Sequence, residues 1–301
     1  MKYRTFVHRP AAGLSLVELL AALAMAGLLL AAGIQWLQWS SRAQRELQAA
    51  LEVQEQTRAA LDLLESEVRQ AGAYGLLSAR SPIDGSTLLG SSELPALAAG
   101  GRCIPSLAHD LAHPVQWKTW SGGAWPVACA AGPDGRAMPG SAILLTRRAT
   151  TALGTDDDGT LWVETTPIGG RLRNGLQGVV LKSGFPEPGS GLLATATPAA
   201  PAQALLVVNA FYVSRDSTGV RNQPSLRRKQ LVGGTTGPRF EDEELVPGVE
   251  RLAVSAVPTP SGSTGRLILL AITARSLRMP ELKRNAQRMV LLRNGTATPW
   301  P

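Results

Sequence analysis

The chain has 301 residues, 44% of them hydrophobic, with two cysteines and a formal net charge of +7. Three of the positive charges, Lys2, Arg4 and Arg9, lie in the first thirteen residues, so 7 minus 3 leaves about +4 for the rest of the chain. That balance is too mild to indicate nucleic-acid binding by itself, and the length suits one globular domain, or two small ones, behind a membrane anchor.

An apolar run follows this basic leader. From Leu14 to Trp39 its 26 residues contain a single charge, Glu18, and at about 1.5 Å per residue a helix of this length measures roughly 39 Å, enough to cross a bilayer. The leader's positive charges favour the cytoplasmic side, which places the chain after Trp39 on the far side of the membrane. A carboxylate at bilayer depth costs on the order of 3 kcal/mol, so Glu18 needs a partner or a function. Cleavage after Gly13 supplies one, because the free ammonium of Leu14 in a neighbouring copy can pair with Glu18.

The sequence Gly13-Leu14-Ser15-Leu16-Val17-Glu18-Leu19-Leu20 resembles the class III signal of type IV pilins and type II secretion pseudopilins. The resemblance implies that an aspartyl prepilin peptidase removes the leader 1–13 and methylates Leu14, and that Glu18 guides docking into the growing filament. Leu14 departs from the family pattern, in which the first mature residue is usually phenylalanine. Two alternatives stay open: a secretory signal cleaved after Ala26, and an uncleaved anchor, which gives Gly13 and Glu18 no purpose.

The helix is predicted to continue beyond the membrane. Residues 41–70 contain no Gly or Pro and are rich in strong helix formers. Apolar residues at steps of three or four predict one amphipathic face, made of Leu47, Leu51, Leu61, Leu64 and Val68. Gly72 and Gly75 are typical of a helix C-terminus. We therefore expect one helix of about 55 to 60 residues, transmembrane over 14–39 and amphipathic over 40–75.

A long irregular excursion is expected over residues 76–140, which are rich in Gly, Pro, Ser and Ala. Cys103 and Cys129 both lie there, and the expected topology puts them in an oxidising compartment, which favours a disulfide. Bridging two cysteines 26 positions apart would remove roughly 3 to 4 kcal/mol of loop entropy from the unfolded chain. Two buried free thiols are the alternative.

Strand-like runs separated by Gly, Pro, Asn or Asp predict an antiparallel sheet in the remainder. Together with the long helix they indicate an α+β, pilin-like fold with a periplasmic head over residues 76–301. The expected strands cover residues 142–146, 161–165, 179–181, 204–214, 226–232, 249–257, 267–274 and 289–293.

Four further phrases resemble the PilW family of minor pilins. They are Arg69-Gln70-Ala71-Gly72, Phe211-Tyr212-Val213 leading to Pro224-Ser225-Leu226-Arg227-Arg228, Glu244-Leu245-Val246-Pro247-Gly248-Val249-Glu250, and Val290-Leu291-Leu292-Arg293-Asn294. The GspJ pseudopilin shares the N-terminus and the plan but is typically much shorter, so length favours PilW. The resemblance implies a non-enzymatic subunit without cofactor, held in the inner membrane by a single span. It also implies that the subunit acts with the assembly platform, other minor pilins, the major pilin and a tip adhesin to start pilus assembly. The subunit is then expected at the filament tip.

Two patterns are features of a different class, a membrane-tethered metal enzyme or a DNA-uptake binder, but for each a simpler interpretation is favoured. A hairpin after residue 214 is expected to carry a basic cluster at its tip, although a solvated face is favoured because no aromatic residue is interleaved; the cluster comprises Arg215, Arg221, Arg227, Arg228 and Lys229. His109 and His113 have zinc-ligand spacing, with Cys103 a conceivable third ligand, but Pro114 ends any helix there and surface histidines are favoured. The acidic run 156–158 lacks EF-hand spacing and predicts a polar turn.

Overall fold

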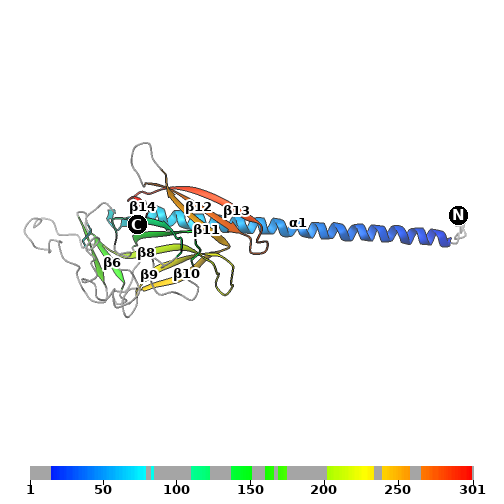
Figure 1. Cartoon of the computed structure of the whole chain (residues 1–301), viewed down its shortest axis with the longest axis horizontal. Helices are drawn as coiled ribbons and strands as arrows, with labels where there is room; N and C mark the ends of the chain where they lie inside the picture. The colour runs from blue at the N-terminus through cyan, green and yellow to red at the C-terminus, as the bar shows by residue number, and fades with distance from the viewer. Residues whose placement is uncertain are drawn as a thin grey trace, which may run out of the picture. The chain divides into compact units, whose positions relative to one another are not determined.

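A computed structural model describes residues 15–78, 83–84, 110–122, 137–150, 160–165, 169–174, 202–233, 239–257 and 266–299. In these residues one long helix is followed by strands, the α+β layout that the sequence predicts (Figure 1). The chain divides into two compact units, Met1–Ala49 and Ala50–Pro301, with the boundary inside the helix. Some predictions lie outside the described residues: those on Gly13, Leu14, Cys103, Cys129, His109, the acidic run 156–158 and the strand 179–181.

Helix α1 (Leu16–Gln70) has 55 residues, within the predicted length, and it continues past the two serines that follow Trp39. The helix ends at Gln70, just before Gly72, as the sequence predicts. Gly72 has a φ of +79°, and its N–H donates to the carbonyl of Arg147 over 2.9 Å. A Cβ at Gly72 would lie 2.8 Å from the Asn294 carbonyl oxygen, so both the backbone angle and the space require glycine.

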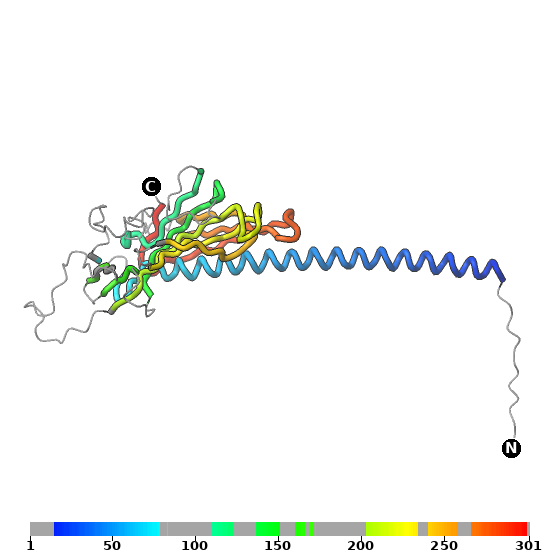
Figure 2. Tube along the Cα trace, turned by 90° about the horizontal axis from the view of Figure 1, so that it is seen from below, coloured from blue at the N-terminus to red at the C-terminus, as the bar shows by residue number. Residues whose placement is uncertain are grey.

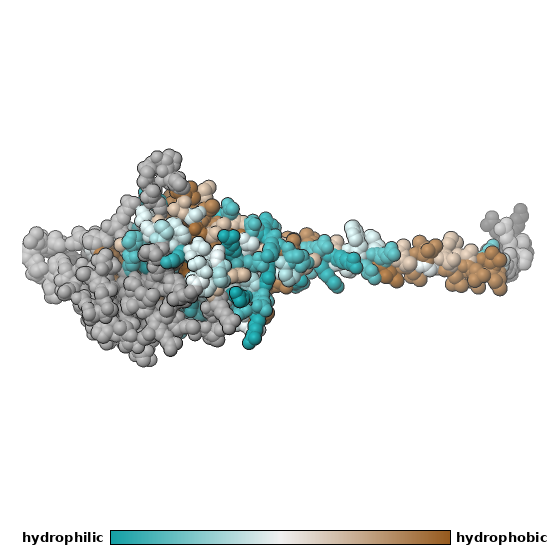
Figure 3. Space-filling model, in the orientation of Figure 1, coloured by the Kyte–Doolittle hydropathy of each residue, from teal (hydrophilic) through white to brown (hydrophobic). Residues whose placement is uncertain are grey.

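The part of α1 in the first unit is long and apolar enough to cross a membrane. Its large apolar side chains are exposed throughout, from Leu16 to Trp39, and Figure 3 shows them as a brown surface along the helix. Apolar side chains exposed over this length need a non-aqueous surrounding. A single N-terminal span of this kind is compatible with single-pass anchoring in a membrane.

In the second unit α1 buries one face, which matches the predicted face only in part. Leu61, Leu64 and Val68 are buried as expected, whereas Leu51 is 57% exposed. The buried stripe passes through Val53, which lies about 160° around the helix axis from Leu51 at 100° per residue. The prediction failed at Leu51 because ten positions separate it from Leu61, which turns it about 80° around the helix axis, away from the buried stripe. The polar residues of the true stripe, Thr57 and Glu67, are buried with it.

Most of the strands in the described residues form one nine-stranded sheet. Its path runs β14-β4-β5-β8-β6-β7-β3, and β9 joins β8 and carries β10 at its outer side. Neighbours are antiparallel except in the pairs β14–β4 and β3–β7. The strands are β3 (Ile83–Asp84), β4 (Val115–Thr119), β5 (Ala142–Thr150), β6 (Leu161–Thr165), β7 (Gly170–Asn174), β8 (Ala202–Ser214), β9 (Ser225–Val232), β10 (Arg239–Pro247) and β14 (Ala297–Pro299).

Two smaller sheets complete the described part of the chain. One pairs β1 (Ala73–Tyr74) with β2 (Leu77–Ser78), directly after the helix. The other is an antiparallel meander of β11 (Val249–Ala256), β12 (Leu267–Arg275) and β13 (Lys283–Leu291). Figures 1 and 2 both show this meander beside the last part of α1.

Both faces of the large sheet are covered by a hydrophobic core. Side chains alternate along its central strands, so neighbouring residues belong to opposite cores. In β8, Phe211 and Val213 join the core that contains Leu64 and Val68 of α1 and the inner face of β11–β13. Tyr212, between them in sequence, joins a second core on the opposite face of the sheet. A strand covered on both faces reads as a continuous apolar run, which is why β8 was predicted almost in full.

Several strands correct the sequence prediction. The segment 76–140 is not wholly irregular, since it holds β2, β3 and β4 in its described residues. The last long strand, β13, starts at Lys283 and not at residue 289, and β7, β10 and β14 were not predicted. These strands are polar or very short, so their pairing depends on neighbours distant in sequence rather than on a local apolar pattern.

Candidate functional site

The first candidate site is the start of α1, where Glu18 lies. The Val17 N–H donates to the Ser15 hydroxyl oxygen over 3.3 Å, and the Ser15 N–H donates to Glu18 Oε2 over 3.1 Å. The Ser15 carbonyl accepts from the Leu19 N–H over 3.1 Å. This reciprocal arrangement is a capping box, and a carboxylate in the first turn also suits the positive end of the helix dipole. Glu18 therefore has a role within a single chain that the prediction missed, although the spacing Ser15-x-x-Glu18 signalled it.

The capping role leaves Glu18 available for a second contact. Its side chain is exposed, and a carboxylate can accept about four hydrogen bonds, of which the Ser15 N–H uses one. A cation from another chain can therefore bind the same carboxylate. Gly13 and Leu14 lie outside the described residues, so the pairing of Glu18 with a Leu14 ammonium stays a prediction.

The predicted basic cluster does not lie at a hairpin tip. Strands β8 and β9 form the expected antiparallel pair, closing at Ser214 and Ser225, but Arg227 and Lys229 are buried in β9, 4% and 2% exposed. Strand β10 sets its acidic residues directly opposite: Asp242 faces Lys229 and Glu244 faces Arg227. The expectation failed because opposite charges on neighbouring strands pair within the sheet.

An ion cluster forms around Arg227. Its Nε and Nη2 both lie 2.9 Å from Asp242 Oδ2, and its Nη1 lies 3.3 Å from Glu244 Oε2. The Tyr212 hydroxyl donates to Asp242 Oδ1 over 2.7 Å. Burial, followed by the Asp242 carboxylate, raises the pKa of Tyr212, so this hydroxyl stays protonated and remains a donor. The cluster fastens β9 to β10 and leaves Arg227 unavailable to an external ligand.

The loop between β8 and β9 is held by carboxylates. Glu244 accepts hydrogen bonds from the Ser217 hydroxyl, over 2.7 Å, and from the Thr218 N–H. Burial raises the pKa of Glu244, but these hydrogen bonds and the charge of Arg227 outweigh it and hold the pKa below its usual range. Of the five predicted basic residues, only Arg215 and Arg221 are exposed on this loop. Two exposed cations give little support to DNA binding.

His113, unlike His109, lies within the described residues, and it belongs to a structural network. His113 Nδ1 lies 2.9 Å from Asp110 Oδ1, after a turn and not on a helix. Arg147 donates to the His113 carbonyl over 2.5 Å and to Gln116 Oε1 over 2.9 Å. Burial lowers the pKa of Arg147 to about 10, so it still carries its charge at neutral pH. The network ties the segment before β4 to β5, and the described residues contain no group of three His, Cys, Asp or Glu side chains placed to hold a metal.

Polar contacts fix α1 against the strands of the second unit. Glu67, buried on the helix, accepts from Asn209 of β8 over 3.0 Å and pairs with Arg148 of β5 at 3.3 Å. On another side of the helix, Arg288 of β13 binds Asp62 and, over 2.7 Å, Glu65. The hydrogen bonds from Arg288 lower the pKa of both carboxyl groups. These directional contacts set the register of the helix, which apolar packing alone does not do.

Comparison of the chain with models of known families, with curated proteins and with solved structures gave no match. The candidate residues are therefore weighed on their geometry. Glu18 stands at an exposed helix start, and the basic cluster is paired inside the sheet. Gly13, Leu14, Cys103 and Cys129 are outside the described residues, so cleavage, methylation and the disulfide stay predictions.

Proposed function

We propose that the protein is a minor pilin that helps to start type IV pilus assembly. The observation that carries the proposal is α1, one uninterrupted helix of 55 residues. Its first part is apolar and exposed over a bilayer length, and its last part is buried among strands of the second unit. A helix with these two parts serves first as a membrane anchor and then as a rod that packs among other helices.

In this proposal the leader is removed after Gly13, Leu14 is methylated, and α1 holds the subunit in the inner membrane until it is lifted into a filament. Glu18 contributes the charge that pairs with an ammonium of a neighbouring subunit. In a low-dielectric surrounding such a pair forms only with close geometry, which makes it a register device as much as a source of affinity. The partners are other minor pilins, the major pilin, a tip adhesin, the prepilin peptidase and the assembly platform.

Deleting the gene in its own organism tests the proposal. Surface pili and twitching are scored beside secretion of extracellular enzymes, and the intact gene supplied in trans serves as the control. We expect pili and twitching to be lost while secretion stays intact. Lost secretion with normal pili would replace the proposal with a type II secretion pseudopilin, and no change in either would overturn both.

The two roles of Glu18 are separated by a set of three variants. Glu18→Gln keeps a capping partner for Ser15 and removes the charge, whereas Ser15→Ala removes the hydroxyl cap, at a cost of about 1 kcal/mol, and keeps the charge. Glu18→Ala removes both. We expect Glu18→Gln and Glu18→Ala to impair piliation alike in complemented cells, and Ser15→Ala to restore it. Normal piliation with Glu18→Gln would mean that the residue acts only as a cap.

A further inference from the structure

The apolar part of α1 ends in a pattern that marks a membrane surface. Trp36 and Trp39 are 66% and 68% exposed, and tryptophan is enriched where hydrocarbon meets headgroups. A hydrocarbon core of about 30 Å takes some 20 helical residues, so a span that ends at Trp39 begins near Leu20. Glu18 then lies close to the opposite surface. Residues just after Trp39 belong to the headgroup layer on the side where the chain emerges.

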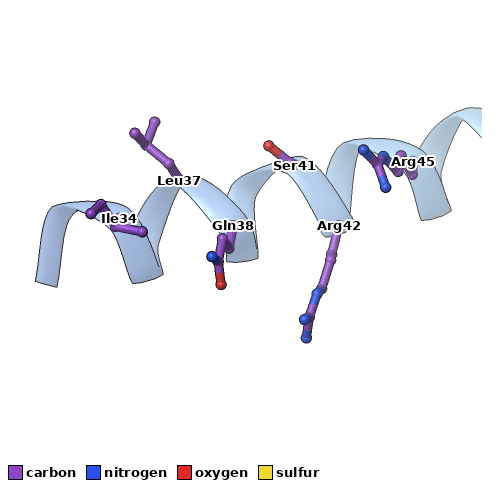
Figure 4. Close-up of a pocket in the computed structure, with 6 residues that line it drawn as sticks. All are labelled: Ile34, Leu37, Gln38, Ser41, Arg42 and Arg45. Atoms are coloured by element: carbon purple, nitrogen blue, oxygen red, sulfur yellow. The ribbon is translucent and has the colours of Figure 1, made fainter. Parts of the chain in front are cut away.

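Four hydrogen-bond donors around Trp39 share one side of the helix. Gln38, Ser41, Arg42 and Arg45 have the spacing i, i+3, i+4, i+7, and all four are exposed. Figure 4 shows Gln38 and Arg42 on the same side of the helix, with no cavity enclosed between them. The set presents an amide, a hydroxyl and two guanidinium groups to whatever surrounds the helix.

Height along the helix axis places these donors within reach of lipid phosphates. Arg42 is about 4.5 Å and Arg45 about 9 Å beyond Trp39 along the helix axis, while the headgroup layer is roughly 5 to 8 Å thick on each side. The long side chain of Arg45 can fold back toward that layer. Both arginines can therefore contact the same layer of phosphates.

These two arginines differ from others on the same helix. Arg58 pairs with Asp62 and Arg69 pairs with Glu65. Arg42 and Arg45 form no ion pair with any described residue, although Glu46 lies four positions after Arg42. Two unpaired guanidinium groups beside exposed tryptophans at the end of a membrane-length segment fit a ligand that is anionic and lies in the membrane surface.

We propose that Arg42 and Arg45, with Ser41, bind the phosphate of an anionic phospholipid in the leaflet from which the chain emerges, at the level that Trp39 marks. Guanidinium groups match phosphate oxygens in a bidentate manner, and the indole ring lies at headgroup level. This contact holds α1 at a fixed depth in the membrane. The inference rests on the membrane anchoring within the proposed function and does not depend on the pilus itself.

The test uses the full chain in phosphatidylcholine vesicles that contain a trace of phosphatidylglycerol carrying a dansyl group on one acyl chain or, in parallel, phosphatidylcholine labelled in the same way, whose headgroup has no net charge, as the comparison tracer. Energy transfer from tryptophan reports how often each tracer lies beside the helix. One arginine at an anionic surface contributes about a fivefold preference. In the wild type we expect more energy transfer to the anionic tracer than to the comparison tracer. This preference should be about fivefold smaller in Arg42→Gln and absent in Arg42→Gln/Arg45→Gln.

Arg58→Gln is the matched control, since it removes an arginine of the same helix that is paired with Asp62; we expect the wild-type preference. Equal transfer to the two tracers in the wild type, or an undiminished preference in the double variant, would overturn the proposal. Such a result would direct the search for an acidic protein partner of this face. Flotation with the vesicles distinguishes failure of the lipid contact from failure of the membrane anchor. A chain that floats but shows no tracer preference refutes only the lipid contact, whereas a chain that does not float refutes the anchor.

Discussion

Replacing Arg227 with methionine is expected to destabilise the second unit strongly. The side chains of Arg227 and Asp242 are 5% and 8% exposed, and the guanidinium is the cation that Asp242 contacts at 2.9 Å. Methionine fills a similar volume but leaves the buried Asp242 carboxylate without the guanidinium that binds it, which costs about 3 to 5 kcal/mol. In a domain of this size each kcal/mol lowers Tm by roughly 2 to 4 °C. The expected fall in Tm is therefore about 6 to 20 °C.

Arg228→Met is the control, because this neighbour in β9 points to the other face and pairs with Glu243, whose side chain is 57% exposed. Its loss is expected to cost about 0 to 1 kcal/mol. Both variants are compared as full chains in detergent, by near-UV circular dichroism on heating and in urea. Arg227→Met/Asp242→Leu should recover much of the stability, since it removes both charges. Equal small losses from Arg227→Met and Arg228→Met would refute the buried cluster and return Arg227 to an exposed binding surface.

Three other perturbations follow from the structure. Glu67→Leu removes the acceptor that α1 offers to the sheet, and we expect the free energy of unfolding in urea to fall by about 1 to 3 kcal/mol; an unchanged midpoint would contradict its register role. Because the folded pKa of Glu244 is lowered, its stabilisation is present above the usual carboxyl pKa and is lost as pH falls through the folded value. The free energy of unfolding of the wild-type chain should thus fall more than that of Glu244→Gln between pH 7 and pH 3. Equal falls would contradict the stabilising role of the Glu244 carboxylate. At Gly248, with a φ of +83°, an added Cβ would lie 2.7 Å from a backbone oxygen, whereas at Gly140, with a φ of +81°, it would meet open space. Gly248→Ala should therefore lower Tm more than Gly140→Ala. The reverse order would contradict the packing around Gly248.

The helix was largely predictable from sequence because its signals are local. An apolar run of membrane length and a glycine after the last turn were enough to give its extent, and Gly72 ends it as expected. The buried face was predictable only in part: Leu61, Leu64 and Val68 are buried as expected, but Leu51 is exposed. Only contact with the strands selects Val53 over Leu51, and that contact is not written in the helix sequence.

The strands show the same division. β8 was predicted because both of its faces are buried and its sequence is continuously apolar. β10 is acidic and has low strand propensity, and it forms a strand because it pairs with the basic β9. Missing β10 also produced the error at Arg227, since its counter-charges come from that strand. The capping box of Ser15 and Glu18, by contrast, involves four consecutive residues, and the Ser15-x-x-Glu18 spacing alone is enough to predict it.

We propose that this chain becomes part of a filament, and its recovery from sheared pili tests that proposal. Pili are sheared from cells that express the chain at its natural level, purified away from membranes, and analysed by mass spectrometry of N-terminal peptides. We expect the chain in the filament fraction, beginning at an N-methylated Leu14. Pili of normal number that lack the chain, with all of it left in the membrane and still carrying residues 1–13, would overturn the proposal.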